Sequence, residues 1–195
     1  ATEDIAVMRA MPNMLVVAPG DPAETRLAVD ALIKYEGPAY LRLGRAGEPV
    51  VHDVDPIFEV GKGITVRTGS DLTLISTGGL LFNTMAAAEI LSESGIQARV
   101  ISMHTIKPLD EEILLNAARE TGAVFTVEEH SIIGGLGGAV AEVLMEKKLG
   151  NTVFKRIGLE GVFSSQVGTQ EYLTAQYGLD PKGISTTVLN VLKTA

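Results

Sequence analysis

The sequence contains no cysteine. Disulfide bonds, thiolate metal sites and a cysteine nucleophile are therefore excluded. The absence is compatible with a cytoplasmic location, which we expect for this protein. No apolar run reaches the length that a transmembrane helix needs, and the acidic residues 1–5 resemble no signal peptide. An initiator methionine is also lacking, which fits a chain that begins inside a longer protein and equally a processed or engineered start.

Basic residues are scarce, because Lys and Arg number 16 against 24 Asp and Glu, and the net charge is −8. An acidic chain repels phosphate backbones and anionic lipid headgroups, and no block of Lys or Arg offsets this repulsion. We therefore expect neither nucleic acid nor membranes as partners. Apolar residues make up 46% of the 195 residues and charged residues 21%, which is typical of a folded globular protein.

Apolar runs typical of buried strands alternate along the chain with segments of helical periodicity. Strands are predicted at residues 15–18, 39–43, 72–76, 98–103, 123–127 and 153–157. Helices are predicted at residues 3–11, 21–36, 80–94, 136–149, 169–177 and 182–193, and one more begins at Asp110. Strands joined through helices form right-handed crossovers, so the sequence predicts an α/β fold with a doubly wound, mostly parallel sheet.

Three predicted helices begin at an aspartate, whose carboxylate can accept a hydrogen bond from the first helical amides. Asp21 and Asp180 are each followed by a proline, which suits the first helical position, and Asp110 begins the third helix. Glu24, three residues after Asp21, is placed to complete a capping box with it.

Residues 44–63 interrupt the alternation of strands and helices. They are rich in glycine and proline and have little helical periodicity, so we interpret them as a linker leading into a short hairpin. Three parts are predicted on this basis. Residues 1–47 form a partial α/β unit that is truncated rather than small, residues 48–57 form the linker, and residues 58–195 form a complete doubly wound domain.

The segment EEHSIIGGLGGA at residues 128–139 joins a predicted strand to a predicted helix. Ligands of parallel sheets favour this end of the strands, and free amides at a helix start can hold an anion. Gly134, Gly135 and Gly137 form a possible ligand loop for an anion such as a nucleotide. A classical dinucleotide fingerprint is rejected because its sixth position is Val140, and no Gly-Lys-Ser/Thr phosphate loop occurs. Alternatively, the glycines let the helix pack closely on the sheet.

The three histidines and one arginine pair are the remaining candidates. His130 is either an acid–base group of the possible ligand loop or a structural, hydrogen-bonding histidine. We interpret His104 as a loop or interface residue and His52 as solvated, and their spacing matches no metal site. Arg42 and Arg45 follow a strand and suit a phosphate or carboxylate, although a solvated surface pair has the same pattern.

Four segments together resemble transketolases, in particular the C-terminal subunit of split transketolases. They are ATEDIAVMRAMPNMLVVAPGDPAE, GPAYLRLGR, HTIKPLDEEIL and VEEHSIIGGLGGAVAEVL. They occur in the expected order and cover nearly the whole chain. A looser version of the pattern is shared by 1-deoxy-xylulose-5-phosphate synthase and by the beta subunits of 2-oxo acid dehydrogenases.

The resemblance implies that residues 1–47 are the C-terminal part of a pyrimidine-binding domain and that residues 58–195 are the transketolase C-terminal domain, which mainly makes dimer contacts. In this family, thiamine diphosphate and magnesium serve the complete enzyme, and the glutamate that activates the cofactor precedes the first residue of this chain. No cofactor is therefore expected in this chain alone. Arg45 resembles the arginine that grips the sugar phosphate.

The complete enzyme implied by the resemblance transfers a two-carbon ketol unit between sugar phosphates of the pentose phosphate pathway. The expected partners are an N-terminal portion or subunit of the same enzyme and a second copy in a homodimer. The isolated chain is expected to be an inactive structural and dimerisation module. Two alternatives stay open, the C-terminal part of 1-deoxy-xylulose-5-phosphate synthase and an anion- or nucleotide-binding regulatory domain.

Overall fold

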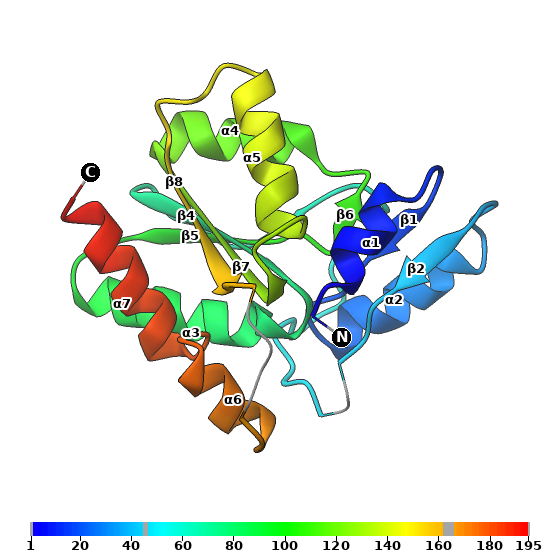
Figure 1. The fold of residues 1–195 in the computed structure, drawn as a ribbon, viewed down its shortest axis with the longest axis horizontal. Coiled ribbons are helices and arrows are strands. Elements are labelled where there is room, and N and C mark those ends of the chain that lie inside the picture. Colours follow the sequence, from blue (N-terminus) through cyan, green and yellow to red (C-terminus); the bar gives the residue numbers. More distant parts are fainter. Residues whose placement is uncertain (1, 45–46, 162–165, 195) are drawn as a thin grey trace.

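The computed structural model describes residues 2–44, 47–161 and 166–194, and it contains two sheets (Figure 1). The smaller sheet has the order β2-β1-β6, with β1 at Leu15–Val17, β2 at Ala39–Leu41 and β6 at Thr105–Lys107. The larger sheet has the order β3-β5-β4-β7-β8, with β3 at Ile64–Arg67, β4 at Leu72–Thr77, β5 at Ala98–Ser102, β7 at Ala123–Ser131 and β8 at Val153–Leu159. The α-helices are α1 (Asp4–Ala10), α2 (Pro22–Leu32), α3 (Leu81–Glu93), α4 (Glu111–Thr121), α5 (Leu136–Glu146), α6 (Gln170–Gln176) and α7 (Pro181–Leu192).

The larger sheet confirms the predicted α/β fold. Strands β5, β4, β7 and β8 are parallel, and helices cover both faces (Figure 1). Successive side chains of β4 point to opposite faces, so Leu74 packs in the core on the α3 and α7 side whereas Ile75 packs on the α4 and α5 side. Burial of both faces explains why β4, β5 and the first part of β7 are mostly apolar in the sequence, whereas the edge strand β8 is only partly buried and contains Lys155 and Arg156. No helix of the described residues is long and apolar enough to cross a membrane.

The smaller sheet combines strands from before and after the predicted linker. Strand β1 pairs in parallel with β2 and antiparallel with β6. Val16 packs with Ile5 of α1 on one face, and Val17 packs with Ala28 of α2 on the other. Strand β6 was not predicted, because it is three residues long and its partner lies about ninety residues away. It gives the sheet of residues 1–47 a third strand from the later part of the chain.

Two local predictions were wrong. Helix α2 ends at Leu32 rather than near residue 36. No hairpin follows the linker, because β3 pairs antiparallel with β5 and not with β4. Strand β4 lies between β5 and β7 and so has no edge left for β3. The three aspartate caps are confirmed, since the carboxylates of Asp21, Asp110 and Asp180 each accept a hydrogen bond from a backbone amide in the first turn.

Residues 48–63, called the strap below, are held to the rest of the protein by hydrogen bonds near both ends. Asp21 Oδ2 accepts the N–H groups of both Val51 and His52, each at 3.0 Å. At the other end, Asp110 Oδ2 accepts the N–H of Gly63 at 2.9 Å. The two aspartates that cap α2 and α4 therefore also hold the strap at its two ends.

The prediction that His52 is solvated is wrong. Its side chain is 9% exposed, and its Nε2 lies 2.9 Å from Oε1 of the fully buried Glu24. The hydrogen bond to this carboxylate raises the pKa of His52. The capping box was also misplaced, because the Glu24 carboxylate accepts the N–H of Gly20 at 2.6 Å rather than that of Asp21. The Glu24 carboxylate also contacts the ring of His52, which lies 28 residues later in the sequence. A local capping pattern does not reveal such a distant partner.

His104 lies beneath the strap and is fully buried. Its ring stacks on Phe58, with centroids 3.9 Å apart, and its Nδ1 lies 3.0 Å from Oγ1 of Thr105. Its Nε2 is buried without a hydrogen-bond partner. Burial lowers the pKa of His104 to about 4, so the ring is neutral near pH 7.

Candidate functional site

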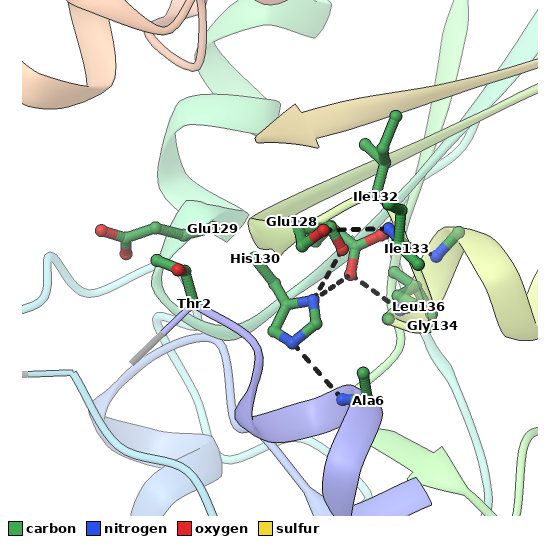
Figure 2. Close-up of polar contacts among 12 residues, drawn as sticks. Thr2, Ala6, Glu128, Glu129, His130, Ile132, Ile133, Gly134 and Leu136 are labelled. Carbon is green, nitrogen blue, oxygen red and sulfur yellow. Dashed lines mark hydrogen bonds and ion pairs between the residues drawn. The ribbon is translucent and has the colours of Figure 1, made fainter. Parts of the chain in front are cut away.

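The glycine-rich segment connects β7 to α5 at the carboxyl end of the larger sheet (Figure 2). Strand β7 continues to Ser131, four residues beyond the predicted end. Glu128 and His130 therefore belong to the strand, and both are fully buried. Figure 2 shows the His130 ring directed toward Ala6 of α1 and the Glu128 carboxylate directed toward Leu136 at the start of α5.

Glu128 already occupies the start of α5. Its Oε2 accepts the N–H of Leu136 at 2.7 Å, and its Oε1 accepts the N–H of Gly137 at 2.8 Å (Figure 2). One of the two interpretations of this segment has these amides free for an anion, and in the structure the buried carboxylate takes that place. Burial raises the pKa of Glu128 to about 7, although the two amide hydrogen bonds and Arg156 act in the opposite direction. A Cβ atom at Gly135 would overlap Glu128 Oε2, so this glycine permits the close approach.

His130 has the contacts of a structural histidine. Its Nδ1 donates to the carbonyl oxygen of Ser131 at 2.7 Å, and its Nε2 accepts the N–H of Ala6 at 3.4 Å. These two partners assign the proton of the neutral ring to Nδ1. Burial lowers the pKa of His130, which agrees with a neutral ring. Both ring nitrogens are thus used within the protein.

Helix α1 docks on the glycine segment. Ser131 donates its N–H to the carbonyl oxygen of Thr2 at 2.7 Å. The Nη1 atom of Arg9 donates to the carbonyl oxygens of Gly134, at 2.8 Å, and Gly135, at 3.2 Å. Together with the contact between His130 and α1, these bonds hold the first residues of the chain against the glycine segment and the larger sheet. This contact region between α1 and residues 128–137 is called the joint below.

Gly134 is required at this joint for two reasons. Its φ is +76°, and a Cβ atom there would lie 2.8 Å from Cβ of Ala6. We expect Gly134→Ala to lower the free energy of unfolding by about 2 kcal/mol, through backbone strain and the overlap with α1. Gly122 is a matched control, because its φ is +67° and nothing lies within 4 Å of its Cβ position. Chemical denaturation should give a loss of only about 1 kcal/mol for Gly122→Ala, and equal losses would contradict the docking contact.

Arg42 is an internal residue rather than half of a solvated pair. Its side chain is 16% exposed, and its Nε lies 3.0 Å from Oδ2 of Asp4. Its Nη2 donates to the carbonyl oxygen of Glu129 at 2.9 Å, while the Tyr40 hydroxyl donates to the same Asp4 oxygen at 2.6 Å. Arg42 therefore ties the end of β2 to α1 and to β7. Arg45 lies outside the described residues, and its contact with a sugar phosphate stays a prediction.

A pocket of about 450 Å³ opens beside the segment that leads to Arg45. Its walls include Val29 of α2 and Leu43, Gly44 and Glu48. Burial and the nearby charge of Glu129 raise the pKa of Glu48. Within residues 2–44, 47–161 and 166–194, no group of three His, Asp or Glu side chains is arranged to hold a metal ion.

Sequence reasoning missed the residues that organise this end of the molecule. Asp4 holds the side chain of Arg42, which follows 38 residues later, and Glu128 holds backbone amides at the start of the next helix, α5. An acidic residue at a strand end, directly before a glycine-rich helix start, was the available signal for Glu128.

Two family models match the chain. The model described as "Transketolase, C-terminal domain" matches residues 61–191, and "Transketolase, pyrimidine binding domain" matches residues 1–48. The chain belongs to the transketolase family. The resemblance read from the four segments is thereby confirmed.

Transketolase relatives cover nearly all of this chain. It is 43% identical over 193 residues to a transketolase C-terminal section of Methanocaldococcus jannaschii, with 98% of this chain and 60% of the relative covered. It is 44% identical over 193 residues to one subunit of the apulose-4-phosphate transketolase of Phocaeicola vulgatus, with 97% and 60% covered. A solved structure, a split gene transketolase described as an inactive beta4 tetramer, has a TM-score of 0.92 and 43% identity, with 99% of this chain and 62% of that chain covered.

The transketolase chain is also 39% identical over 190 residues to 1-deoxy-D-xylulose-5-phosphate synthase of Trichormus variabilis, with 95% of this chain and 30% of the relative covered. It spans about 60% of the length of the first two transketolase relatives. Thiamine diphosphate is the cofactor that the transketolase family implies for the complete enzyme.

Proposed function

We propose that this chain is the C-terminal part of a transketolase that transfers a two-carbon ketol unit between sugar phosphates. The observation that carries the proposal is the pair of matched models in one chain, with the pyrimidine-binding model before the C-terminal one. Relatives that are transketolase sections or subunits, and of which this chain spans about 60%, support a partner portion that completes the enzyme.

The chain contributes binding and architecture rather than the chemical step. Thiamine diphosphate, when bound in the complete enzyme, stabilises the two-carbon carbanion. The models that match this chain are those of the pyrimidine-binding and C-terminal domains, so we assign the magnesium and diphosphate of this cofactor to the N-terminal partner portion. Arg45 holds the phosphate of the sugar, and residues 58–195 provide contacts for a homodimer. The isolated chain is inactive.

Ketol transfer measured on the chain with its N-terminal portion tests the proposal. The mixture should transfer ketol groups from a ketose phosphate to an aldose phosphate, and neither part alone should do so. If the chain alone transfers ketol groups at the rate of the mixture, or the mixture remains inactive with every sugar phosphate pair, the proposal is wrong.

Arg45→Ala should raise the KM for the sugar phosphate about 30-fold, because it removes charge-assisted hydrogen bonds to a phosphate. Steady-state kinetics of the mixture give this value. Arg119→Ala is the matched control, because Arg119 is an exposed arginine in the last turn of α4 and does not line the pocket beside this segment. An unchanged KM in Arg45→Ala would remove this residue from the phosphate site.

The relatives that are 1-deoxy-D-xylulose-5-phosphate synthases favour one second candidate. The same mixture supplied with pyruvate as donor separates the two activities, because only the synthase releases carbon dioxide from pyruvate. Ketol transfer from a ketose phosphate without release of carbon dioxide supports the transketolase.

A further inference from the structure

A pocket of about 190 Å³ lies at the carboxyl end of β4, beside the glycines that follow this strand. The helix after β4, α3, covers one face of the larger sheet, whereas α5, the helix after the neighbouring strand β7, covers the other face (Figure 1). The carboxyl ends of two such strands form a topological switch point, where ligands of open α/β sheets preferentially bind. The position of this pocket therefore favours a ligand site.

Three parts of the chain form the walls of the pocket. Residues 47–49 lie at the start of the strap, residues 79–83 begin α3, and residues 170–174 belong to α6. The described residues that line the pocket include two carboxylates, Glu48 and Glu171, and neither lysine nor arginine. A ligand in this pocket therefore meets negative charge in the described walls.

The other polar side chains of the walls use their donors inside the protein. Nδ2 of Asn83 donates to the carbonyl oxygen of Leu179 at 3.0 Å, and Nε2 of Gln170 donates to Oε2 of Glu129 at 3.3 Å. The hydroxyl of Thr174 donates to carbonyl oxygens of its own helix at 3.0 Å. The side-chain oxygens of Asn83 and Gln170 remain as acceptors. A ligand that fits these walls therefore brings hydrogen-bond donors.

The charge of Glu48 is poorly compensated within the protein. Its Oε1 is buried without a hydrogen-bond partner. The carboxylate lies against Gly79, where a Cβ atom would be 2.5 Å from Oε1 and 2.6 Å from Oε2. Burial and the charge of Glu129 raise the pKa of Glu48, although the Gln170 amide and the charge of Arg42 act in the opposite direction. A positive charge beside this carboxylate would stabilise its ionised form.

From these walls we infer that the pocket binds a small organic cation, whose ammonium or guanidinium group pairs with Glu48. Such groups supply positive charge and only donors, which are the two properties that the walls lack. Phe82, which lines the pocket and is 44% exposed, adds an aromatic ring, and aromatic rings attract organic cations. The cation is a free small molecule or a Lys or Arg side chain of a partner, because both have this chemistry. Its binding is an activity beyond the proposed ketol transfer.

Titration of the chain with n-butylammonium chloride, followed by NMR at constant ionic strength, tests the site. The amide signals of Gly47 and Gly79 should shift and reach saturation. n-Butanol and sodium butyrate are controls of similar size, and they should cause no saturable shift because neither carries a positive charge. Equal shifts with n-butanol, or no saturable shift with n-butylammonium, would overturn the inference.

Glu48→Gln should weaken the binding of n-butylammonium about 10-fold, because a charge-assisted hydrogen bond becomes a neutral one. Glu146→Gln is the matched control, since Glu146 is exposed at the end of α5 and its substitution changes the net charge equally. Its affinity should be unchanged. Phe82→Leu should weaken binding about 3-fold through loss of the ring. Unchanged affinity in Glu48→Gln, or equal losses in Glu48→Gln and Glu146→Gln, would contradict pairing with Glu48.

The same titration on the complex with the N-terminal portion identifies the source of the cation. Binding that persists in the complex supports a free small molecule, whereas binding that is lost there supports a Lys or Arg side chain of the partner. Ketol transfer is measured separately. If the complex transfers ketol groups while the chain binds no cation, the inference fails and the proposed function stands. If the chain binds the cation and the mixture transfers no ketol groups, the proposed function alone fails.

Discussion

Glu128→Ala should lower the free energy of unfolding by about 4 kcal/mol, because it leaves the N–H groups of Leu136 and Gly137 buried without acceptors. Each such unsatisfied buried donor costs roughly 1–3 kcal/mol. Glu128 is fully buried, so water does not replace the lost acceptor without rearrangement of the joint. Equilibrium denaturation by urea, followed by circular dichroism, measures the change.

Glu129→Ala is the neighbouring control. The side chain of Glu129 accepts an exposed hydrogen bond from Nε2 of Gln170 at 3.3 Å. The carbonyl oxygen that binds Arg42 belongs to the backbone and is kept. We expect a change within about 0.5 kcal/mol. A similar loss of unfolding free energy in the two variants would contradict a stabilising role of the hydrogen bonds from Leu136 and Gly137 to Glu128.

His104→Leu should remove about 3 kcal/mol of acid sensitivity from the free energy of unfolding. The folded pKa of His104 is about 4, below the ordinary value of 6.5. The unfolded chain therefore takes up a proton below pH 6.5 that the folded protein accepts only near pH 4. Between these pH values the protein loses about 1.4 kcal/mol per pH unit through this one group. The leucine variant does not titrate, and the loss of the Nδ1 contact with Thr105 lowers its stability at both pH values alike, so this loss cancels in the pH dependence.

The measurement compares unfolding free energies of the two proteins at pH 6.5 and pH 4. Comparison with the variant is necessary because Glu128 changes the stability in the opposite direction. The folded pKa of Glu128 is raised to about 7, so this group lowers the stability as the pH rises from 4.5 through 7.

His52→Leu is a second control of opposite sign. The raised pKa of His52 gives stability that is present below 6.5 and is lost as the pH rises through the folded value. A pH dependence that is the same in His104→Leu and in the unmodified protein would show that His104 is not buried as a neutral ring.

The sequence predicted the elements whose signals are local. Strands β4, β5 and β7 of the larger sheet are buried on both faces and mostly apolar over the predicted ranges. The helix starts at Asp21, Asp110 and Asp180 have their acceptor and first amides within three residues. Contacts between distant segments were not predictable in this way. Strand β6 is recognisable only from its pairing with β1, and the second role of Asp21 depends on amides about thirty residues later.

The same limit applied to the candidate site. From the sequence, the glycine segment had two interpretations, an anion loop with free amides or a close contact of the helix with the sheet. The amides at the start of α5 are free or capped depending on the direction in which the Glu128 side chain points. The sequence pattern does not show this direction. His130 and Glu128 lie two residues apart, yet one holds α1 and the other holds α5.

Calorimetric titration with thiamine diphosphate and magnesium tests most directly whether this chain is one part of a two-part enzyme. The chain alone should release or absorb no binding heat, and binding should occur once the N-terminal portion is added. Tight binding by the chain alone would place the cofactor site within these 195 residues and would contradict the assignment of the chemistry to the partner.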